Sequence, residues 1–258
     1  MEKAATAPAL AGWYVISLRP SGSHGPVRRA AAALGARVLA VSTLALRERP
    51  VGPALQAALA CPVVVVTSPA AVVFASRQAT LRVQPGQRWF ALGEGSARAL
   101  ARAGVPGAIT PAGGSDSESL LALPSLQAPL VRVGLVTAPG GRGLIPETLA
   151  GRGAEIHRAD VYRREAIRPR ASQLAALAAL PPRSALLVTS SEAFDGLWSV
   201  LDAPARDQLR ARPAVASSPR LAVQLAALGF QAIVPAPGAA PGKLLEALAA
   251  DVARGRFR

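Results

Sequence analysis

Two pairs of neighbouring hydroxyl residues in this chain stand where a short apolar run ends and a helical pattern begins. Thr67 and Ser68 form the first pair, and Thr189 and Ser190 form the second. Hydroxyls and free backbone N–H groups at a helix N-terminus bind carboxylate or phosphate groups. Serine and threonine also cap helices where no ligand binds. Anion binding and helix capping both remain open for these four residues, and one loop can serve both roles.

Ser191 directly follows the second pair. Further residues suited to anion binding follow other apolar runs: Arg19, Gly93, Ser96, Arg142 and Ser218. Arg142 lies in the glycine-rich turn 138–143, which lacks the Gly-Lys-Ser/Thr ending of a phosphate-binding P-loop. The segment around Gly93 lacks the third glycine of a dinucleotide fingerprint. Nucleotide binding is thus poorly supported, and the turn around Arg142 is either an anion-binding nest or a plain turn.

Tyr162 is a candidate proton donor. It is followed in the chain by Arg163 and Arg164, and a phenol can donate a hydrogen bond or act as a weak general acid where its surroundings help. An aromatic side chain in an extended segment also suits packing between domains. The residues alone favour the packing role.

The elements that must position these side chains occur twice in the chain, in the same order. The matching positions are Trp13 and Val131, 118 apart; Gly35 and Gly153, 118 apart; Val63 and Ala185, 122 apart; and Gly104 and Gly229, 125 apart. A solenoid repeat recurs every 20 to 50 residues, so this repeat is too long for one. The pattern predicts two α/β units built on one plan.

Short, continuous apolar runs predict parallel strands that are buried on both faces. The predicted strands are 14–18, 63–66, 89–92, 131–136, 186–188 and 214–216. The predicted helices are 26–34, 96–103, 146–150, 191–200 and 219–228, and left-handed glycines are predicted at Gly35, Gly104, Gly153 and Gly229. This alternation predicts a doubly wound α/β fold, in which ligands bind at the carboxyl ends of the strands. The candidate binding residues stand at or near such ends.

Two extended, charged segments break the alternation. Residues 44–50 and 161–167 occupy equivalent places in the repeat, and we expect them to be paired linker strands at which the chain leaves one domain and later returns to it. Domain 1 then comprises residues 1–44 and 166–258, and domain 2 comprises residues 45–165. Because small molecules commonly bind between domains, a ligand site is expected in a cleft between the two.

The charge of the chain favours an anionic partner. Its formal net charge is +14, and Lys3 and Lys243 are its only lysines, so arginine carries almost all of the positive charge. The arginines are scattered without a basic run, and aromatic residues make up only 4% of the chain, which leaves little for base stacking. A small polyanion is therefore favoured over nucleic acid.

The composition of the chain disfavours a disulfide, a metal site and a membrane span. Cys61 is the only cysteine, and His24 and His157 are the only histidines, so neither a disulfide nor a metal site is expected. No apolar run approaches the length of about 18 residues that a membrane span needs. The first ten residues lack the apolar stretch of a signal peptide, which favours a cytoplasmic protein.

Several of these segments, taken in their order and spacing, resemble the uroporphyrinogen-III synthase family. The segments are Thr67-Ser68 with a following helix, Leu92-Gly93-Glu94-Gly95-Ser96-Ala97 with Gly104, Asp116-Ser117-Glu118-Ser119-Leu120-Leu121, Gly140-Gly141-Arg142-Gly143, Gly153-Ala154 and Val161-Tyr162-Arg163. The resemblance runs from about Trp13 to Leu248. Each motif is weak by itself, and their common order makes the set fairly specific.

The resemblance implies a cofactor-free lyase of tetrapyrrole and heme biosynthesis. Such an enzyme converts hydroxymethylbilane, which carries eight carboxylates, to uroporphyrinogen III with loss of water and inversion of ring D through a spiro intermediate. The family has two α/β domains joined by a two-stranded ladder, with a cleft between them. It is usually monomeric, and hydroxymethylbilane synthase would supply the substrate, with a transient hand-over as one route.

The resemblance also assigns roles to residues. Tyr162 of the Val-Tyr-Arg motif is the favoured donor to the departing hydroxyl. Arginines and helix N-termini would bind the carboxylates through charge-assisted hydrogen bonds. The chain departs from the family where a Gly-Pro-Thr-Thr-Ala-like turn is common, because it has Ser218-Pro219-Arg220-Leu221-Ala222 instead. A non-catalytic two-domain binder of a small polyanionic ligand is therefore the alternative.

Overall fold

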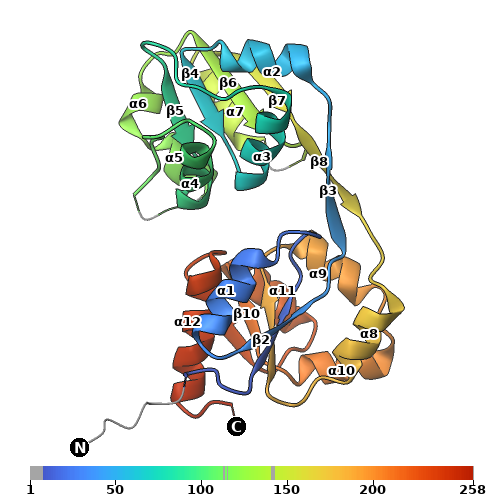
Figure 1. Ribbon diagram of the computed structural model, residues 1–258. Helices are drawn as coiled ribbons and strands as arrows, with labels where there is room; N and C mark the ends of the chain where they lie inside the picture. The colour runs from blue at the N-terminus through green and yellow to red at the C-terminus, as the bar shows by residue number, and fades with distance from the viewer. Residues whose placement is uncertain (1–7, 113, 115, 141–142, 258) are drawn as a thin grey trace, which may run out of the picture. The chain divides into compact units, whose positions relative to one another are not determined.

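The structure, a computed structural model, describes residues 8–112, 114, 116–140 and 143–257. It divides into two compact units. Unit 1 runs to Ala45 and resumes at Glu165, and unit 2 is the inserted segment Leu46–Arg164. Figure 1 labels most of the elements of each unit.

Unit 1 contains a five-stranded parallel sheet in the order β11-β10-β9-β1-β2. Its strands are β1 (Tyr14–Ser17), β2 (Arg37–Ala40), β9 (Ser184–Val188), β10 (Ala214–Ala216) and β11 (Ile233–Pro235). The central strand β9 is buried throughout, as expected for a parallel strand covered by helices on both faces.

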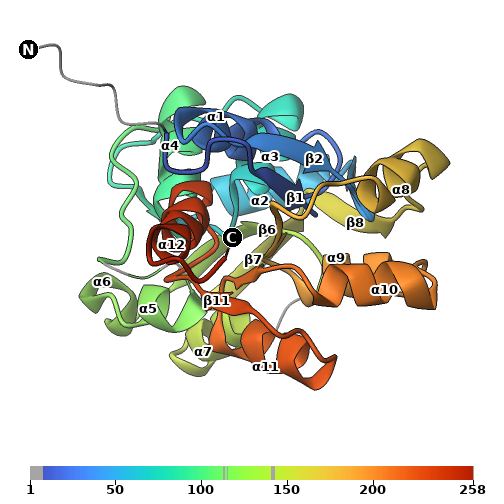
Figure 2. The same cartoon turned by 90° about the horizontal axis from the view of Figure 1, so that it is seen from below.

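Helices cover both faces of this sheet (Figure 2). Helices α1 (Gly25–Ala33) and α12 (Pro241–Ala253) pack on one face, where Val15, Leu187 and Val215 join their apolar side chains. The opposite face, built around Ile16 and Leu186, packs against α8 (Ala171–Ala178), α9 (Ser191–Trp198), α10 (Ala203–Arg210) and α11 (Pro219–Ala227). Neighbouring residues of one strand thus face opposite layers.

Unit 2 contains a four-stranded parallel sheet in the order β5-β4-β6-β7. Its strands are β4 (Val63–Val66), β5 (Arg88–Ala91), β6 (Arg132–Thr137) and β7 (Glu155–Asp160). Phe90 forms an additional parallel bridge with Ile109 on the outer side of β5. This bridge lies where unit 1 has β11 beside β10.

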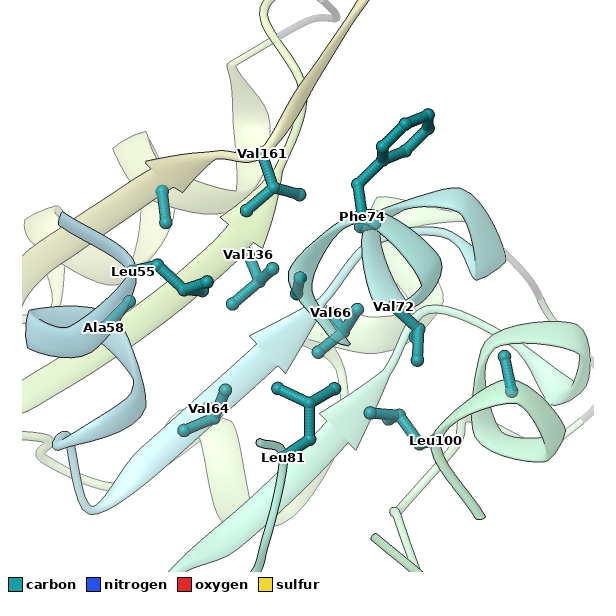
Figure 3. Packing of buried hydrophobic residues seen from close by; sticks show 14 of the residues in the cluster. Leu55, Ala58, Val64, Val66, Val72, Phe74, Leu81, Leu100, Val136 and Val161 are labelled. Atoms are coloured by element: carbon teal, nitrogen blue, oxygen red, sulfur yellow. The ribbon is translucent and has the colours of Figure 1, made fainter. Parts of the chain in front are cut away.

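Helices of unit 2 also cover both faces of its sheet. Val64 and Val66 pack with α2 (Gly52–Leu59), α3 (Pro69–Gln78) and α4 (Glu94–Arg102), as Figure 3 shows for the labelled side chains of this cluster. Val63 and Val65 face the opposite layer of α5 (Ser117–Leu121), α6 (Pro124–Gln127) and α7 (Leu144–Gly151). All four β4 residues are buried, because a valine on either face meets a helix.

Both sheets have the same register once the sequence offsets are applied. In unit 1, Tyr14 pairs with Arg37, and in unit 2 Arg132 pairs with Glu155, each residue 118 positions later. Val15 pairs with Ala185, and the matching pair in unit 2 is Val133 with Val63. Each sheet therefore combines the first half of one repeat with the second half of the other.

The chain passes between the units along a two-stranded ladder of β3 (Leu44–Glu48) and β8 (Tyr162–Ala166). The backbone N–H of Arg49 donates to the Val161 carbonyl (3.0 Å), and that of Ile167 donates to the Thr43 carbonyl (2.8 Å). These pairs run in opposite directions, so the ladder is antiparallel. Figure 1 shows the two strands side by side.

The predicted fold class is confirmed: the protein is α/β with two similar parallel-sheet units and a two-stranded ladder. The strands and helices predicted from the sequence occur within three residues of the expected bounds. The four glycines predicted to be left-handed have φ between 78° and 98°. Among the described residues, no helix is long and apolar enough to cross a membrane.

Candidate functional site

Hydroxyl side chains meet at the carboxyl edge of the unit 2 sheet. Thr67 follows β4 and Thr137 ends β6, and because these strands are neighbours their hydroxyl oxygens are 2.7 Å apart. One residue further, Ser68 Oγ lies 3.1 Å from the phenol oxygen of Tyr162. The fold thus brings Tyr162 to a serine 94 positions away in the sequence.

Tyr162 is held firmly at this edge. Its ring stacks on Phe74 of α3, with ring centroids 5.3 Å apart and planes at 19°, and the residue is only 6% exposed. Gln78 of the same helix donates to the backbone carbonyl of Arg49 (2.9 Å), which borders the ladder. The phenol therefore has one orientation, and its hydroxyl lies beside the start of α3.

The hydrogen bonds of Ser68 decide what the phenol can do. Ser68 caps α3, and its Oγ accepts the backbone N–H of Ala71 at 3.0 Å. This bond does not use the hydroxyl proton of Ser68, which is therefore available for donation to the phenol oxygen of Tyr162. If Ser68 donates to the phenol oxygen, the proton of Tyr162 is free for another acceptor. In that direction of donation, Ser68 and Tyr162 form a short donor chain that ends in the phenolic O–H.

Serine caps also line the carboxyl edge of the unit 1 sheet. Ser190 accepts the backbone N–H of Ala193 (3.3 Å) at the start of α9, and Ser218 accepts that of Leu221 (3.4 Å) at the start of α11. Thr189 and Ser190 are both partly exposed. Both helix N-termini follow adjacent parallel strands, so their positive dipole ends lie at the same edge.

A cation reaches the same edge. The Arg220 guanidinium donates to Ser191 Oγ at 3.1 Å, and Ser191 donates onward to the Gln224 side chain at 2.7 Å. Ser191 is therefore engaged within the protein, and its hydroxyl proton is already used. Arg220 belongs to the turn Ser218-Pro219-Arg220-Leu221-Ala222 that departs from the resembled pattern, and it adds a positive charge there.

Arg19 follows β1 in unit 1 and is partly buried. Its Nη2 donates to the carbonyl of Ala239 at 2.6 Å. Burial lowers the pKa of its guanidinium from the ordinary value, because a buried charge loses hydration. The equivalent residue of unit 2 is Thr137, so at this one position unit 1 has a cation and unit 2 has a neutral hydroxyl.

Two predicted binding residues, Gly93 and Ser96, occupy other environments. Gly93 is the N-cap of α4 in extended conformation. Ser96 lies inside that helix and is 4% exposed, unlike the capping serines. Arg142 lies outside the described residues. Neighbouring Gly140 is left-handed (φ 82°), and the Pro139 carbonyl accepts from Arg164 at 3.2 Å.

Sequence reasoning missed the residues that support Tyr162. Phe74 and Gln78 belong to an ordinary amphipathic helix, and nothing in its pattern marks them as contacts of the ladder. It also missed the hydrogen bonds that His24 makes with Ser17 and Ser42. Among the residues placed by the structure, no group of three or more His, Cys, Asp or Glu could hold a metal ion.

Two parallel sheets, each covered by helices and joined by an antiparallel ladder, define a two-unit, doubly wound α/β protein. Comparison with known proteins identifies which family this is. A family model described as uroporphyrinogen-III synthase HemD matches residues 26–246. The chain belongs to the uroporphyrinogen-III synthase family and is an enzyme of porphyrin biosynthesis.

Individual relatives agree with the family model. The chain is 34% identical over 187 residues to uroporphyrinogen-III synthase of Escherichia coli K12, covering 69% of this chain and 74% of that protein. It is 36% identical over 164 residues to the Salmonella typhimurium LT2 enzyme, covering 62% and 66% of the two chains.

Solved structures show the same fold. A mutant uroporphyrinogen III synthase of the extreme thermophile Thermus thermophilus matches with a TM-score of 0.56 at 21% identity, covering 94% of this chain and 99% of that one. The Helicobacter pylori 26695 uroporphyrinogen-III synthetase matches with a TM-score of 0.60 at 17% identity, covering 95% and 99%. At these identities, the likeness concerns the fold alone.

Proposed function

We propose that this chain is a uroporphyrinogen-III synthase, a lyase that cyclises hydroxymethylbilane to uroporphyrinogen III with loss of water and inversion of ring D. The match of the family model over residues 26–246 carries the proposal. The donor pair of Ser68 and Tyr162 supports it, because the first step needs a proton for a departing hydroxyl.

The reaction begins by breaking the C–O bond of the substrate's hydroxymethyl group. The adjacent pyrrole nitrogen supplies electrons, and the hydroxyl leaves with a proton from Tyr162 as water. The azafulvene that remains is attacked by the terminal pyrrole at its substituted carbon, which gives the spiro intermediate. The original bond between ring D and the methylene that joins it to ring C then breaks, and the free α-carbon of ring D bonds to that methylene, so that ring D is inverted. Closure releases one proton, which restores the phenol, so that the net change is loss of water.

Ser68 would orient the proton of Tyr162. Since its Oγ accepts from the α3 backbone, the Ser68 hydroxyl can donate to the phenol oxygen and direct the phenol's own proton outward. Because the azafulvene forms with help from its own ring, a weak acid is sufficient. The main task of the protein is to impose geometry on a reactive intermediate, and the proposed steps use no cofactor.

Binding of the substrate would use the polar residues at the strand ends. Arg19 and the N-termini capped by Ser190 and Ser218 offer charge and N–H donors to carboxylates. Thr67 offers a hydroxyl at the unit 2 edge. We also propose Gly93, Ser96, Arg142, Thr189 and, through its backbone N–H at the start of α9, Ser191 as further binding residues.

The proposal includes the biological setting. Residues 1–44 with 166–258 and residues 45–165 would be the two domains of a monomeric, cytoplasmic enzyme. Its unstable substrate would come from hydroxymethylbilane synthase, and a transient hand-over would shorten the time in which the substrate closes unaided.

The test measures the isomers that the protein produces. Hydroxymethylbilane is generated in situ with the purified full chain, the products are oxidised, and the uroporphyrin isomers are separated by chromatography. We expect type III, whereas unaided closure gives type I. Type I alone from folded protein would refute the proposal, favour the non-catalytic binder and implicate Arg220 in the altered turn.

The Tyr162→Phe variant tests the donor. We expect kcat to fall about 100-fold without being abolished, at the lower end of the effect of a general acid. Tyr14→Phe is the matched control, because Tyr14 is the only other tyrosine and its phenol accepts from Arg37 on the unit 1 surface. Full activity of Tyr162→Phe would remove this assignment.

A further inference from the structure

A buried histidine, His24, is linked to the backbone of Arg19 in unit 1 through one serine side chain. His24 precedes α1 and is 8% exposed, and its ring lies between two serine side chains. Nδ1 is 2.9 Å from Ser17 Oγ, and Nε2 is 2.8 Å from Ser42 Oγ. Ser17 ends β1 and Ser42 follows β2, so the imidazole bridges the carboxyl ends of two neighbouring strands.

Counting protons fixes the tautomer of the imidazole. The single hydroxyl proton of Ser42 goes to the backbone carbonyl of Arg19, at 2.9 Å. Ser42 can therefore only accept from His24, which places the ring proton on Nε2. The bare Nδ1 must then accept the hydroxyl proton of Ser17. The chain of donors runs from Ser17 through His24 and Ser42 to the carbonyl of Arg19.

The surroundings keep this ring neutral. Burial, Arg28 of α1 and Arg19 itself lower the pKa of His24 to about 4. A second proton would add a third positive charge here and would remove the acceptor that Ser17 uses. The neutral ring accepts from Ser17 and donates to Ser42, whereas an imidazolium would donate to both serines and leave the Ser17 hydroxyl proton without this acceptor.

Two further hydrogen bonds hold the loop that carries Arg19 against the rest of unit 1. The backbone N–H of Ser21 donates to the Leu44 carbonyl (2.8 Å), and the Arg19 guanidinium donates to the Ala239 carbonyl (2.6 Å). The Ser42 bond is the one that holds the backbone carbonyl of Arg19 itself. If that bond is lost, the guanidinium remains on a loop that is free to shift by the fractions of an ångström that matter for a carboxylate contact.

We propose that neutral His24 is a positioning residue that fixes the Arg19 loop through Ser42 and thereby sets the affinity for a substrate carboxylate. This inference rests on the proposed function, in which Arg19 binds the substrate. His24 does not touch the reacting atoms, so it would act on KM and leave the chemical step unchanged.

The test is a double-mutant cycle on turnover of hydroxymethylbilane. We expect His24→Leu to raise KM about fivefold to tenfold, the loss of one hydrogen bond, with kcat within about twofold of the parent. Arg19→Met should raise KM as well, and His24→Leu should add nothing further in that background. His24→Gln keeps a donor for Ser42 and should recover most of the affinity.

Two kinetic outcomes would overturn the proposal. One is an unchanged KM in folded His24→Leu protein, and the other is a full additional loss of affinity when the substitution is made in Arg19→Met. If His24→Leu fails to fold, Ser42→Ala carries the same expectations, because it removes only the bond to the Arg19 carbonyl and the acceptor of Nε2–H.

A spectroscopic measurement separates this proposal from the assigned activity. Nitrogen-15 NMR of the wild-type protein at pH 7 should show His24 with Nε2 protonated and Nδ1 bare, with His157→Asn used to assign the two histidine signals. A protonated Nδ1 would refute the donor chain. Wild-type protein that makes only type I product would refute the proposed function and leave the tautomer measurement standing.

Discussion

Replacing Gly134 by alanine should destabilise unit 2 and leave unit 1 unchanged. Gly134 lies in β6 at the centre of the unit 2 sheet, between Val64 of β4 and His157 of β7. A β-carbon at this position would lie 1.9 Å from the carbonyl oxygen of Ala58 and 2.7 Å from its carbonyl carbon. Both atoms belong to the backbone of α2, so no side-chain rotation relieves the clash.

The magnitude follows from what must move. A carbon and an oxygen that are not bonded need a separation above about 3 Å, so α2 must withdraw by about 1 Å from β6. Ala58 and Leu55 of that helix are fully buried, and the shift would loosen their contacts in the close-packed core. Overpacking of this kind costs about 3 kcal/mol. With a urea m-value of about 1.5 kcal/mol/M, the unfolding midpoint should fall by about 2 M.

The three tryptophans make the assay specific for each unit. Trp89 lies in the core of unit 2 and is 4% exposed, whereas Trp13 and Trp198 belong to unit 1. In a background with Trp13→Phe and Trp198→Phe, urea unfolding followed by fluorescence reports on unit 2. The complementary Trp89→Phe background reports on unit 1, whose midpoint should stay unchanged.

Gly151→Ala is the matched control. Gly151 ends α7, and a β-carbon there would meet nothing within 4 Å. Alanine is favoured over glycine in helices, so this substitution should stabilise unit 2 by up to about 1 kcal/mol. An unchanged midpoint for Gly134→Ala would refute the close approach of α2 and β6.

Other perturbations should act on unit 1. The pKa of His24 is about 4 in the folded protein, against 6.5 for the free group, so the unfolded chain binds more protons between these values. Stability should therefore fall by about 3 kcal/mol as the pH drops from 7 to 4, and urea titrations of His24→Gln should lack this part of the loss. Asp251 is 2% exposed and accepts from two C-terminal arginines; Asp251→Asn should cost about 2 kcal/mol in thermal unfolding. In Gly196→Ala, the new β-carbon would lie 2.9 Å from Thr43 Cβ, and the unit 1 midpoint in the Trp89→Phe background should fall by the equivalent of about 1 kcal/mol.

The strands and helix ends could be predicted because burial and backbone conformation leave local marks. The four valines of β4 are apolar at every position because both faces of the strand meet helices. Gly35 and Gly153 recur at one offset because each ends a helix with positive φ. Strands and helix ends of this kind can be predicted from residues that are close in the sequence, because a continuous apolar run must be buried on both faces.

The candidate site could be predicted only in outline. The rule that ligands bind at the carboxyl ends of parallel strands pointed to Thr67 and Ser68, and the family resemblance pointed to Tyr162. That Ser68 meets Tyr162, or that His24 links Ser17 to Ser42, follows from contacts between segments that no pattern in the sequence joins.

The sequence by itself determined that the chain holds two copies of one α/β plan, where their strands lie and which family they resemble. The paired linker segments 44–50 and 161–167 also predicted which halves of the repeats share a domain. Only the tertiary structure decided the strand pairing inside each sheet and the side-chain contacts that follow from it. In the structure β4 pairs with β6 and β9 pairs with β1, and Thr67 thereby lies beside Thr137 and Ser68 beside Tyr162. The sequence does not fix these contacts, because packing joins residues 70 and 94 positions apart whose local patterns are independent of each other.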